Sequence, residues 1–186
     1  KAPVIEGAYR QAGIIQVDRE DEWFPVAMTL ASQSSASGQR VAVLSDGGGH
    51  ATLAADSLTK AGLSLSSLEP DTVATLEEMV PDSPNVTNPV DVVGDVSQFQ
   101  ACARVLTSDA NVDVLLVTGT LGGYGDYQRF DTQAELEVEA TTELAAIAET
   151  SDIPIVVHSC YASQTNEALA HLRQSNVPLI DSLDIA

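Results

Sequence analysis

The stretch VAVLSDGGGHATLAAD, residues 41–56, contains the features that decide the fold. An apolar run comes first, three consecutive glycines and His50 follow, and a helical pattern of apolar residues completes it. An apolar run without polar alternation is typical of a strand that is buried on both faces of a parallel sheet. The stretch therefore predicts a strand, a tight turn and a helix, which is the repeating unit of α/β proteins.

The same alternation of buried strand and one-sided helix continues to the end of the chain. Further apolar runs lie at residues 112–118, 153–158 and 177–180, and a weaker one lies at 63–68. Helical patterns separate them, and one of these has its apolar stripe at Leu136, Ala140, Leu144 and Ala148. We therefore predict a flavodoxin-like, doubly wound parallel sheet with helices on both faces.

The first residues follow a different pattern. Two segments with apolar residues at helical spacing flank a short apolar run at 14–17, which predicts a short strand. A polar segment at 32–39 indicates a linker or tight loop. We expect residues 1–36 to be the C-terminal remnant of a preceding domain and residues 37–186 to form one flavodoxin-like domain. The start at Lys1, without an initiator methionine, suggests a fragment of a longer polypeptide.

The charge is the most unusual property of the composition. The chain has 27 acidic and 8 basic residues, a formal net charge of −19, yet 44% of its residues are hydrophobic. Acidic residues spread over a well-formed core favour a protein adapted to a salt-rich, halophilic cytoplasm, where self-repulsion is screened. The absence of a basic stripe argues against nucleic acid as a partner. The sequence has no apolar stretch long enough to cross a membrane, and its two cysteines form neither a disulfide framework nor a zinc pattern.

The glycine loop after the first strand is the leading candidate site. In an open parallel sheet, ligands bind beyond the carboxyl ends of the strands. Backbone amides of Gly47, Gly48, Gly49 and His50 could surround a phosphate at the start of the next helix. The loop matches neither the P-loop nor the dinucleotide fingerprint, and a plain turn with positive-φ glycines remains the alternative. His50 is then either a neutral phosphate contact or a plain hydrogen-bonding residue at the helix start, and a covalent role is disfavoured.

Three other segments end at the same predicted edge of the sheet. Gly122 and Gly123 could form a second amide cradle or a flexible loop of small residues. In NPVDVVGD, Asn88 and Asp91 are candidate lining residues, whereas capping of the next helix suits Asp95. His158, before Ser159 and Cys160, is better explained as structural, because the sequence identifies no acid partner for a triad. No metal site is predicted.

Four segments, taken in order, carry a family resemblance. RQAGIIQV, GQRVAVLSDGGGHATLAADSLTKAGL, NPVDVVGD and NVDVLLVTGTLGG resemble the NDP-forming acyl-CoA synthetases, also called ADP-forming acetyl-CoA synthetases, of the succinyl-CoA synthetase superfamily. The resemblance covers nearly the whole chain. Family members typically have Thr-Asn-Ala-Gly-Gly-Pro-Gly at the first loop, so His50 stands where proline is usual.

The resemblance implies an acid–thiol ligase that converts acyl-CoA, phosphate and ADP to acid, CoA and ATP through an acyl phosphate and a phosphohistidine. The phosphohistidine usually lies in a Ser-His-Thr segment before the RQAGII-like helix, so we expect it outside this chain, together with a CoA-binding domain and an ATP-grasp domain. This chain would contribute phosphate-stabilising glycine loops and no nucleophile, and would be inactive alone. The resemblance assigns CoA, ADP or ATP, and magnesium to the full, oligomeric protein, and no cofactor to this fragment.

Two other functions are compatible with the same residues. Some acetyltransferases carry a degenerate copy of this synthetase as a regulator, so a non-catalytic regulatory or scaffold domain is the alternative. A flavodoxin proper is disfavoured, because only 4% of the residues are aromatic and few are available to enclose a flavin.

Overall fold

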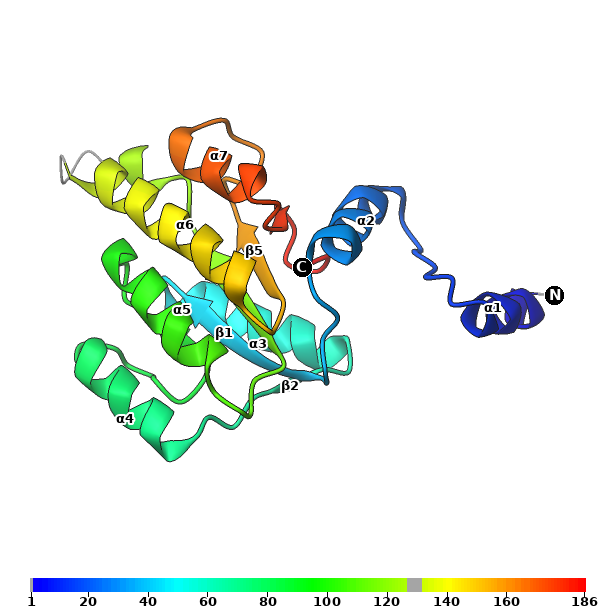
Figure 1. Ribbon diagram of the computed structural model, residues 1–186, viewed down its shortest axis with the longest axis horizontal. Coiled ribbons are helices and arrows are strands. Elements are labelled where there is room, and N and C mark those ends of the chain that lie inside the picture. Colours follow the sequence, from blue (N-terminus) through cyan, green and yellow to red (C-terminus); the bar gives the residue numbers. More distant parts are fainter. Residues whose placement is uncertain (1, 127–131) are drawn as a thin grey trace.

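A parallel sheet forms the centre of the molecule in the computed structural model, which describes residues 2–126 and 132–186 (Figure 1). Its long strands are β1 (Arg40–Ser45), β4 (Val114–Gly119) and β5 (Ile155–Ser159), and its short ones are β2 (Ser64–Leu65), β3 (Val90–Asp91) and β6 (Leu179–Ile180). The order is β2-β1-β4-β5-β6, all parallel, and β3 pairs with the far end of β1. With the two-residue β3 set aside, this is the flavodoxin-like order, and it confirms the predicted fold class.

Helices cover both faces of the sheet (Figure 1). One face carries α3 (Gly48–Lys60). The other carries a layer of α4 (Pro70–Met79), α5 (Phe99–Thr107), α6 (Gln133–Thr150) and α7 (Glu167–Gln174). Short 3₁₀ segments lie at Glu20–Glu22, Val96–Gln98 and Tyr124–Asp126. None of the helices in the described ranges combines the length and the apolar character that a bilayer span requires.

The central strands divide their side chains between two apolar clusters. In β1, Val41 and Val43 pack toward α3, and Ala42 and Leu44 pack toward the opposite helix layer. This follows from the two-residue period of a strand, because successive side chains point to opposite faces. Both faces are buried, which explains why the strand sequences are continuously apolar.

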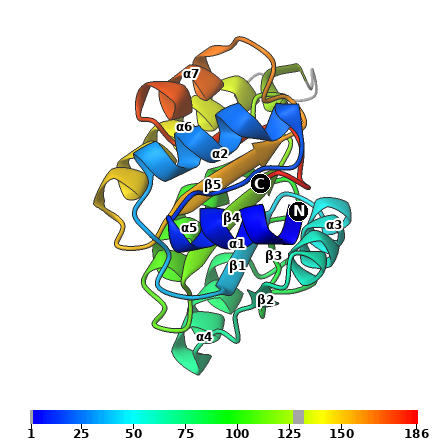
Figure 2. The ribbon, with the colours of Figure 1, turned by 90° about the vertical axis from the view of Figure 1, so that its right-hand side faces the viewer.

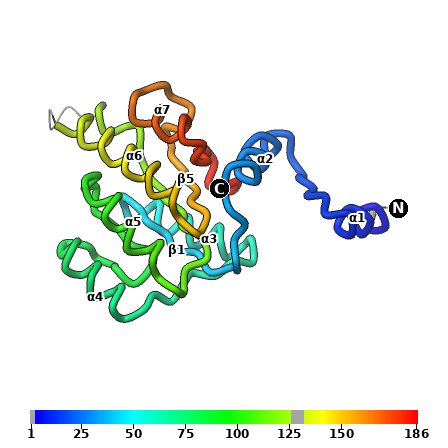
Figure 3. The backbone as a smooth tube through the Cα atoms, in the orientation of Figure 1, coloured from blue at the N-terminus to red at the C-terminus, as the bar shows by residue number. Residues whose placement is uncertain are grey.

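The N-terminal segment lies apart from this core. Helix α1 (Ala2–Gln11) projects away from the sheet (Figure 3), whereas α2 (Trp23–Ser32) lies beside the C-terminal end of the chain on the face that carries α3 (Figure 2). The chain then rejoins the sheet at Gln33, whose side-chain oxygen accepts a hydrogen bond from the Ile155 amide at 3.0 Å. The boundary near residue 36 stays a prediction.

The predicted strand at residues 14–17 is wrong. This segment has no strand structure, and Ile14 and Ile15 are 51% and 58% exposed. The physical reason is its position outside the sheet, where no described strand pairs with its backbone. Apolar composition alone does not form a strand without a neighbour that accepts its hydrogen bonds.

Candidate functional site

The loops after β1 and β4 meet at the switch point of the sheet. The two strands are adjacent, with Ser45 opposite Thr118, and the chain winds outward from them in opposite directions. In doubly wound sheets the ligand crevice opens at this point, beyond the carboxyl ends of the strands. The predicted loops 47–50 and 122–123 therefore both leave the sheet at the expected edge.

The carboxylate of Asp46 joins these two loops. Its Oδ2 atom accepts hydrogen bonds from the Thr120 amide at 2.7 Å, the Thr120 hydroxyl at 2.5 Å and the Tyr124 hydroxyl at 3.1 Å. Burial and the charge of Asp46 raise the pKa of Tyr124 well above its usual range, so the phenol stays protonated and donates. Because its side chain is only 4% exposed and accepts these three hydrogen bonds, Asp46 has a fixed position at the switch point.

The N-terminus of α3 is open at the three glycines. Gly47 is the N-cap in extended conformation, with φ −174°, and Gly48 begins the helix without a side-chain cap. None of the three glycines has positive φ, so the alternative of a turn that needs such glycines is not what the structure contains. A Cβ atom at Gly47 or Gly49 would meet nothing within 4 Å. The fold itself therefore does not require glycine at these two positions.

Asp91 lies beside this helix start. It ends β3 opposite Ser45, and its Oδ2 atom would be 3.7 Å from a Cβ atom at Gly48. Its Oδ1 atom accepts the Val93 amide at 2.8 Å, and the residue is 6% exposed. The structure thus brings Asp91 and the glycine loop together as predicted neighbours, and the carboxylate interacts favourably with the positive end of the α3 dipole.

The second glycine pair has a different environment. The Gly122 amide donates to the buried Glu137 carboxylate, and the Gly123 amide donates to the Thr120 carbonyl oxygen at 2.9 Å. A Cβ atom at Gly122 would overlap Leu169, and one at Gly123 would overlap the Tyr161 ring. These glycines are explained by packing, and both amides already have acceptors inside the chain.

Asn88 lies in the sheet edge rather than at the open end of the strands. Its side chain accepts the Val43 amide at 2.9 Å and donates to the carbonyl oxygens of Val41 at 2.9 Å and Ser66 at 3.0 Å. It thereby satisfies the backbone of β1 between the places where β2 and β3 pair with it. The predicted cap is confirmed at Asp95, whose carboxylate accepts the Ser97 amide at 3.1 Å.

A cluster of His50, His158 and Cys160 occupies the α3 side of the same edge. The His50 and His158 ring centroids are 6.2 Å apart, and His50 Nε2 lies 3.3 Å from Cys160 Sγ. His158 is 5% exposed, and its Nδ1 shares a 2.8 Å hydrogen bond with the Thr118 hydroxyl. Burial and, second, His50 lower the pKa of His158, so this ring is neutral and structural.

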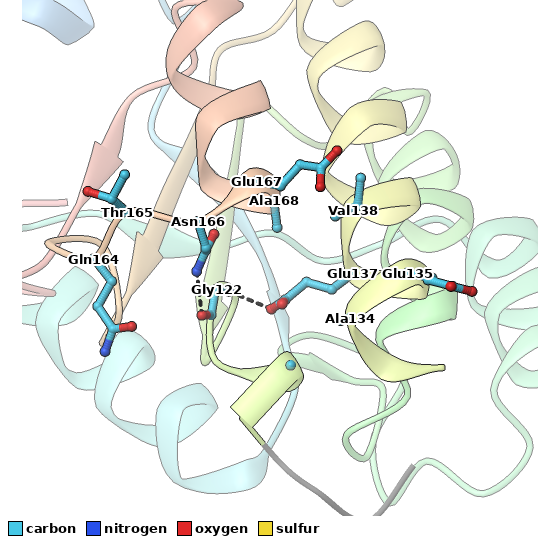
Figure 4. Close-up of a pocket in the computed structure, with 11 residues that line it drawn as sticks. Gly122, Ala134, Glu135, Glu137, Val138, Gln164, Thr165, Asn166, Glu167 and Ala168 are labelled. Atoms are coloured by element: carbon cyan, nitrogen blue, oxygen red, sulfur yellow. Dashed lines mark hydrogen bonds between the residues drawn. The ribbon is translucent and has the colours of Figure 1, made fainter. Parts of the chain in front are cut away.

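A cavity of about 530 Å³ opens between the turn at Gly122 and the starts of α6 and α7 (Figure 4). The side chains of Glu135, Glu137 and Glu167 line it, together with the amide of Asn166, which donates to the Gly122 carbonyl oxygen at 2.6 Å. Among the residues that the structure describes, its lining includes three acids and no lysine or arginine. The three carboxylates disfavour an anion among these described lining residues.

Within residues 2–126 and 132–186, no group of three or more His, Cys, Asp or Glu side chains is placed to hold a metal ion. The sequence reasoning missed Asp46 and Cys160 as members of the site. Both had a local signal, because each stands at the end of a predicted central strand. Their partners are 74 and 110 residues away in the chain, at Thr120 and His50.

The fold and these loops define a flavodoxin-like α/β domain with its polar residues gathered at the switch point. The family model of the Ligase-CoA domain matches residues 41–181, and the chain belongs to this family.

Two curated relatives are ADP-forming acetate–CoA ligases of archaea. The chain is 34% identical over 111 residues to ADP-forming acetate–CoA ligase I of Archaeoglobus fulgidus, which covers 59% of this chain and 16% of that protein. It is 33% identical over 115 residues to the alpha subunit of ADP-forming acetate–CoA ligase II of Pyrococcus furiosus. This aligned region covers 61% of this chain and 25% of that subunit. The chain therefore spans a quarter or less of the length of these relatives.

Solved structures share the fold. A protein from Pyrococcus horikoshii OT3 has a TM-score of 0.80 at 23% identity, over 98% of this chain and 41% of that chain. The dinucleotide-forming acetyl-coenzyme A synthetase 1 of Candidatus Korarchaeum cryptofilum, in complex with phosphate and ADP, has a TM-score of 0.76 at 21% identity, over 100% of this chain and 39% of that chain.

Proposed function

We propose that this chain is the Ligase-CoA part of an acyl-CoA synthetase that interconverts acyl-CoA, phosphate and ADP with acid, CoA and ATP. The ADP-forming acetate–CoA ligases among its relatives support this reaction class. In this proposal the phosphoryl group is carried by a histidine outside residues 1–186, as the family resemblance implies. Residues 37–186 form the domain that meets that group, and residues 1–36 belong to the preceding one.

One observation carries the phosphate-binding role: the open N-terminus of α3 at the switch point. The first N–H groups of an α-helix have no partner within it, and the dipole adds partial positive charge there. Gly48 and Gly49 are exposed, and Cβ atoms at Gly47 and Gly49 would project into free space. Glycine weakens a helix by up to about 1 kcal/mol relative to alanine. The fold does not need glycine at positions 47 and 49. Access of a phosphate to the backbone amides explains why glycine stands there.

The three candidate regions have different roles in this proposal. The amides of Gly48, Gly49 and His50 contact the phosphate, and Gly47 leaves their approach open. Asp91 borders the site, with its Oδ2 atom 3.7 Å from the position of a Cβ atom at Gly48. Gly122 and Gly123 hold the neighbouring turn in place by packing, whereas Asn88 supports β1 from the sheet edge.

The remaining components belong to other parts of the proposed enzyme. CoA, the nucleotide and its magnesium ion are bound by a CoA-binding domain and an ATP-grasp domain, with which this chain assembles in an oligomer in the cytoplasm. Small-molecule substrates and these protein domains are the proposed partners, and the formal net charge of −19 disfavours nucleic acid.

The test is phosphate dependence in the full-length protein that contains this chain. Gly49→Ala fills the space above the α3 amides, and we expect kcat/KM for phosphate to fall about tenfold or more, measured as ATP formed from acetyl-CoA, phosphate and ADP. Gly7→Ala is the matched control, because Gly7 is also helical and its Cβ would also meet nothing within 4 Å. Unchanged phosphate kinetics in Gly49→Ala would refute the role of α3. Absence of ATP formation by the wild-type protein, with acetyl-CoA binding retained, would favour the regulatory alternative.

A further inference from the structure

A thiol, an imidazole and a carboxylate follow one another at the switch point. Cys160 Sγ lies 3.3 Å from His50 Nε2, and His50 Nδ1 lies 3.5 Å from Asp46 Oδ1. The two ring nitrogens of His50 therefore face different groups. This is the order of nucleophile, base and orienting acid that activates cysteine in acyl-transfer sites.

The exposure of Cys160, His50 and Asp46 suits a nucleophile, a base and an orienting acid, respectively. Cys160 is exposed, so a substrate can reach its sulfur. The His50 side chain is 26% exposed and the Asp46 side chain 4%. Thr120 and Tyr124 donate to Oδ2 of Asp46, which leaves Oδ1 directed at His50. The carboxylate is thus held in place by the loop after β4 and can fix the orientation of the ring.

The fold supplies this arrangement from three separate strands. Asp46 follows β1, Thr120 follows β4 and Cys160 follows β5, and the Cys160 amide donates to the Gly119 carbonyl oxygen at 3.2 Å. His50 is the third residue of α3, so the amides of Gly48 and Gly49 in the first turn of this uncapped helix precede it. Such amides stabilise negative charge on an oxygen atom, as a carbonyl under attack requires.

We infer that Asp46, His50 and Cys160 form a nucleophilic site in which the Cys160 thiol accepts an acyl group from an acyl thioester. Cys160 Sγ forms a bond to the carbonyl carbon as His50 Nε2 takes the thiol proton. The bond between that carbon and the sulfur of the donor thiol then breaks, and His50 returns the proton to the departing thiolate. One thioester replaces another, so no oxidant or further reactant is consumed. Asp46 acts as a positioning residue.

The thioester as donor rests on the proposed function, whereas the activated thiol rests on the geometry alone. The full-length protein is incubated with acetyl-CoA without phosphate and ADP, and its peptides are analysed by mass spectrometry. We expect one acetyl group on Cys160, released by hydroxylamine, and none on Cys102, which is fully buried. Burial raises the pKa of the Cys102 thiol to about 11, so it is an inert internal reference.

Two histidine variants test the part played by His50. His50→Gln should slow acetylation of Cys160 about a hundredfold, since it removes the base. His171→Gln, a change on α7 that leaves the cluster intact, should acetylate at the wild-type rate. Equal rates in His50→Gln and wild type, or an unmodified Cys160 in folded protein, would overturn the inference. ATP formation by the same preparation separates the two proposals: ATP without acetylated Cys160 overturns only this one, and acetylated Cys160 without ATP overturns only the synthetase.

Discussion

Arg40 and Asp113 join the starts of the two central strands by a two-pronged ion pair. Arg40 Nε lies 2.9 Å from Asp113 Oδ2, and one terminal nitrogen lies 2.8 Å from Oδ1. The same carboxylate accepts the Arg40 amide and the Ser37 hydroxyl. Asp113 therefore fixes the end of β1 and β4 that is opposite the candidate site, and it holds the linker that enters β1.

This pair predicts a loss of stability in acid. Hydrogen bonds from the Arg40 side chain and then its amide hold the pKa of Asp113 well below the usual range. The folded state therefore releases this proton more readily than the unfolded state, in which an aspartate has a pKa of about 3.9. The stabilisation is present above that pH and is lost as the pH falls toward the folded pKa. Urea unfolding of the wild type should show this decline below about pH 4.

Asp113→Asn isolates the contribution of the pair. The variant should be less stable than wild type at pH 7, and the difference should shrink as the pH falls and Asp113 becomes protonated in the wild type. Asp82→Asn is the control, because Asp82 is an exposed aspartate outside the central strands. If Asp113→Asn keeps a constant deficit at every pH, the ion pair is not the source of the acid sensitivity.

Gly119→Ala should destabilise the switch point. Gly119 has φ +152°, and an added Cβ would overlap the Asp46 carboxylate. The combined backbone and steric strain should lower the free energy of unfolding by about 2 kcal/mol or more, measured with urea. Gly47→Ala is the comparison, since its φ is −174° and its Cβ would be in open space. Equal effects of the two substitutions would contradict the close approach of β4 to Asp46.

The central sheet could be predicted because its strands carry a local signal. The apolar runs at 41–45, 112–118 and 153–158 differ from β1, β4 and β5 by at most two residues at either end. Helix α4 was not predicted, although Pro70 and Asp71 in its first turn are typical of a helix start. The short apolar run at 14–17 was assigned to a strand because local composition cannot show whether a neighbouring strand exists.

The site could be predicted only in part. Its loops have a local sequence signal, whereas its contacts join residues that are far apart in the chain. The sequence indicates which loops follow strands, but the meeting of His50 and Cys160 depends on α3 and β5 flanking the same edge. The same limit applies to Gly122, whose amide is paired with Glu137 from the following helix. A glycine motif specifies a shape that can bind an anion, and only the fold determines whether its amides are free.

Asn88→Ala should lower stability rather than impair phosphate binding. The side chain makes three hydrogen bonds to the backbone of β1 and the β2 region. Its loss removes the acceptor of the Val43 amide, whereas the Val41 carbonyl oxygen keeps its hydrogen bond from the Ser66 amide. We expect a decrease of about 1–3 kcal/mol in the free energy of unfolding. Asn88→Asp should be at least as damaging, because it turns the donor toward Val41 and Ser66 into an acceptor. A higher KM for phosphate at unchanged stability would instead assign Asn88 to the ligand site.

The charge of −19 predicts that salt stabilises the fold. Only eight basic side chains are available to offset 27 acidic ones, so the folded state concentrates like charges that the unfolded chain separates. The screening length falls from about 10 Å at about 0.1 M salt to about 3 Å at about 1 M, which weakens this repulsion. The melting temperature should therefore rise steadily with KCl over that range.

The choice of salt separates screening from a general effect on apolar burial. Potassium chloride acts mainly by screening here, whereas sulfate strengthens the burial of apolar surface in any protein. A triple variant with glutamine at three exposed acids of α6, Glu135→Gln, Glu139→Gln and Glu149→Gln, lowers the charge without changing the strands. It should be more stable than wild type at low KCl and gain less from added KCl, because less repulsion remains to be screened. A wild-type protein that is more stable at low salt than in molar KCl would refute adaptation to a salt-rich cytoplasm.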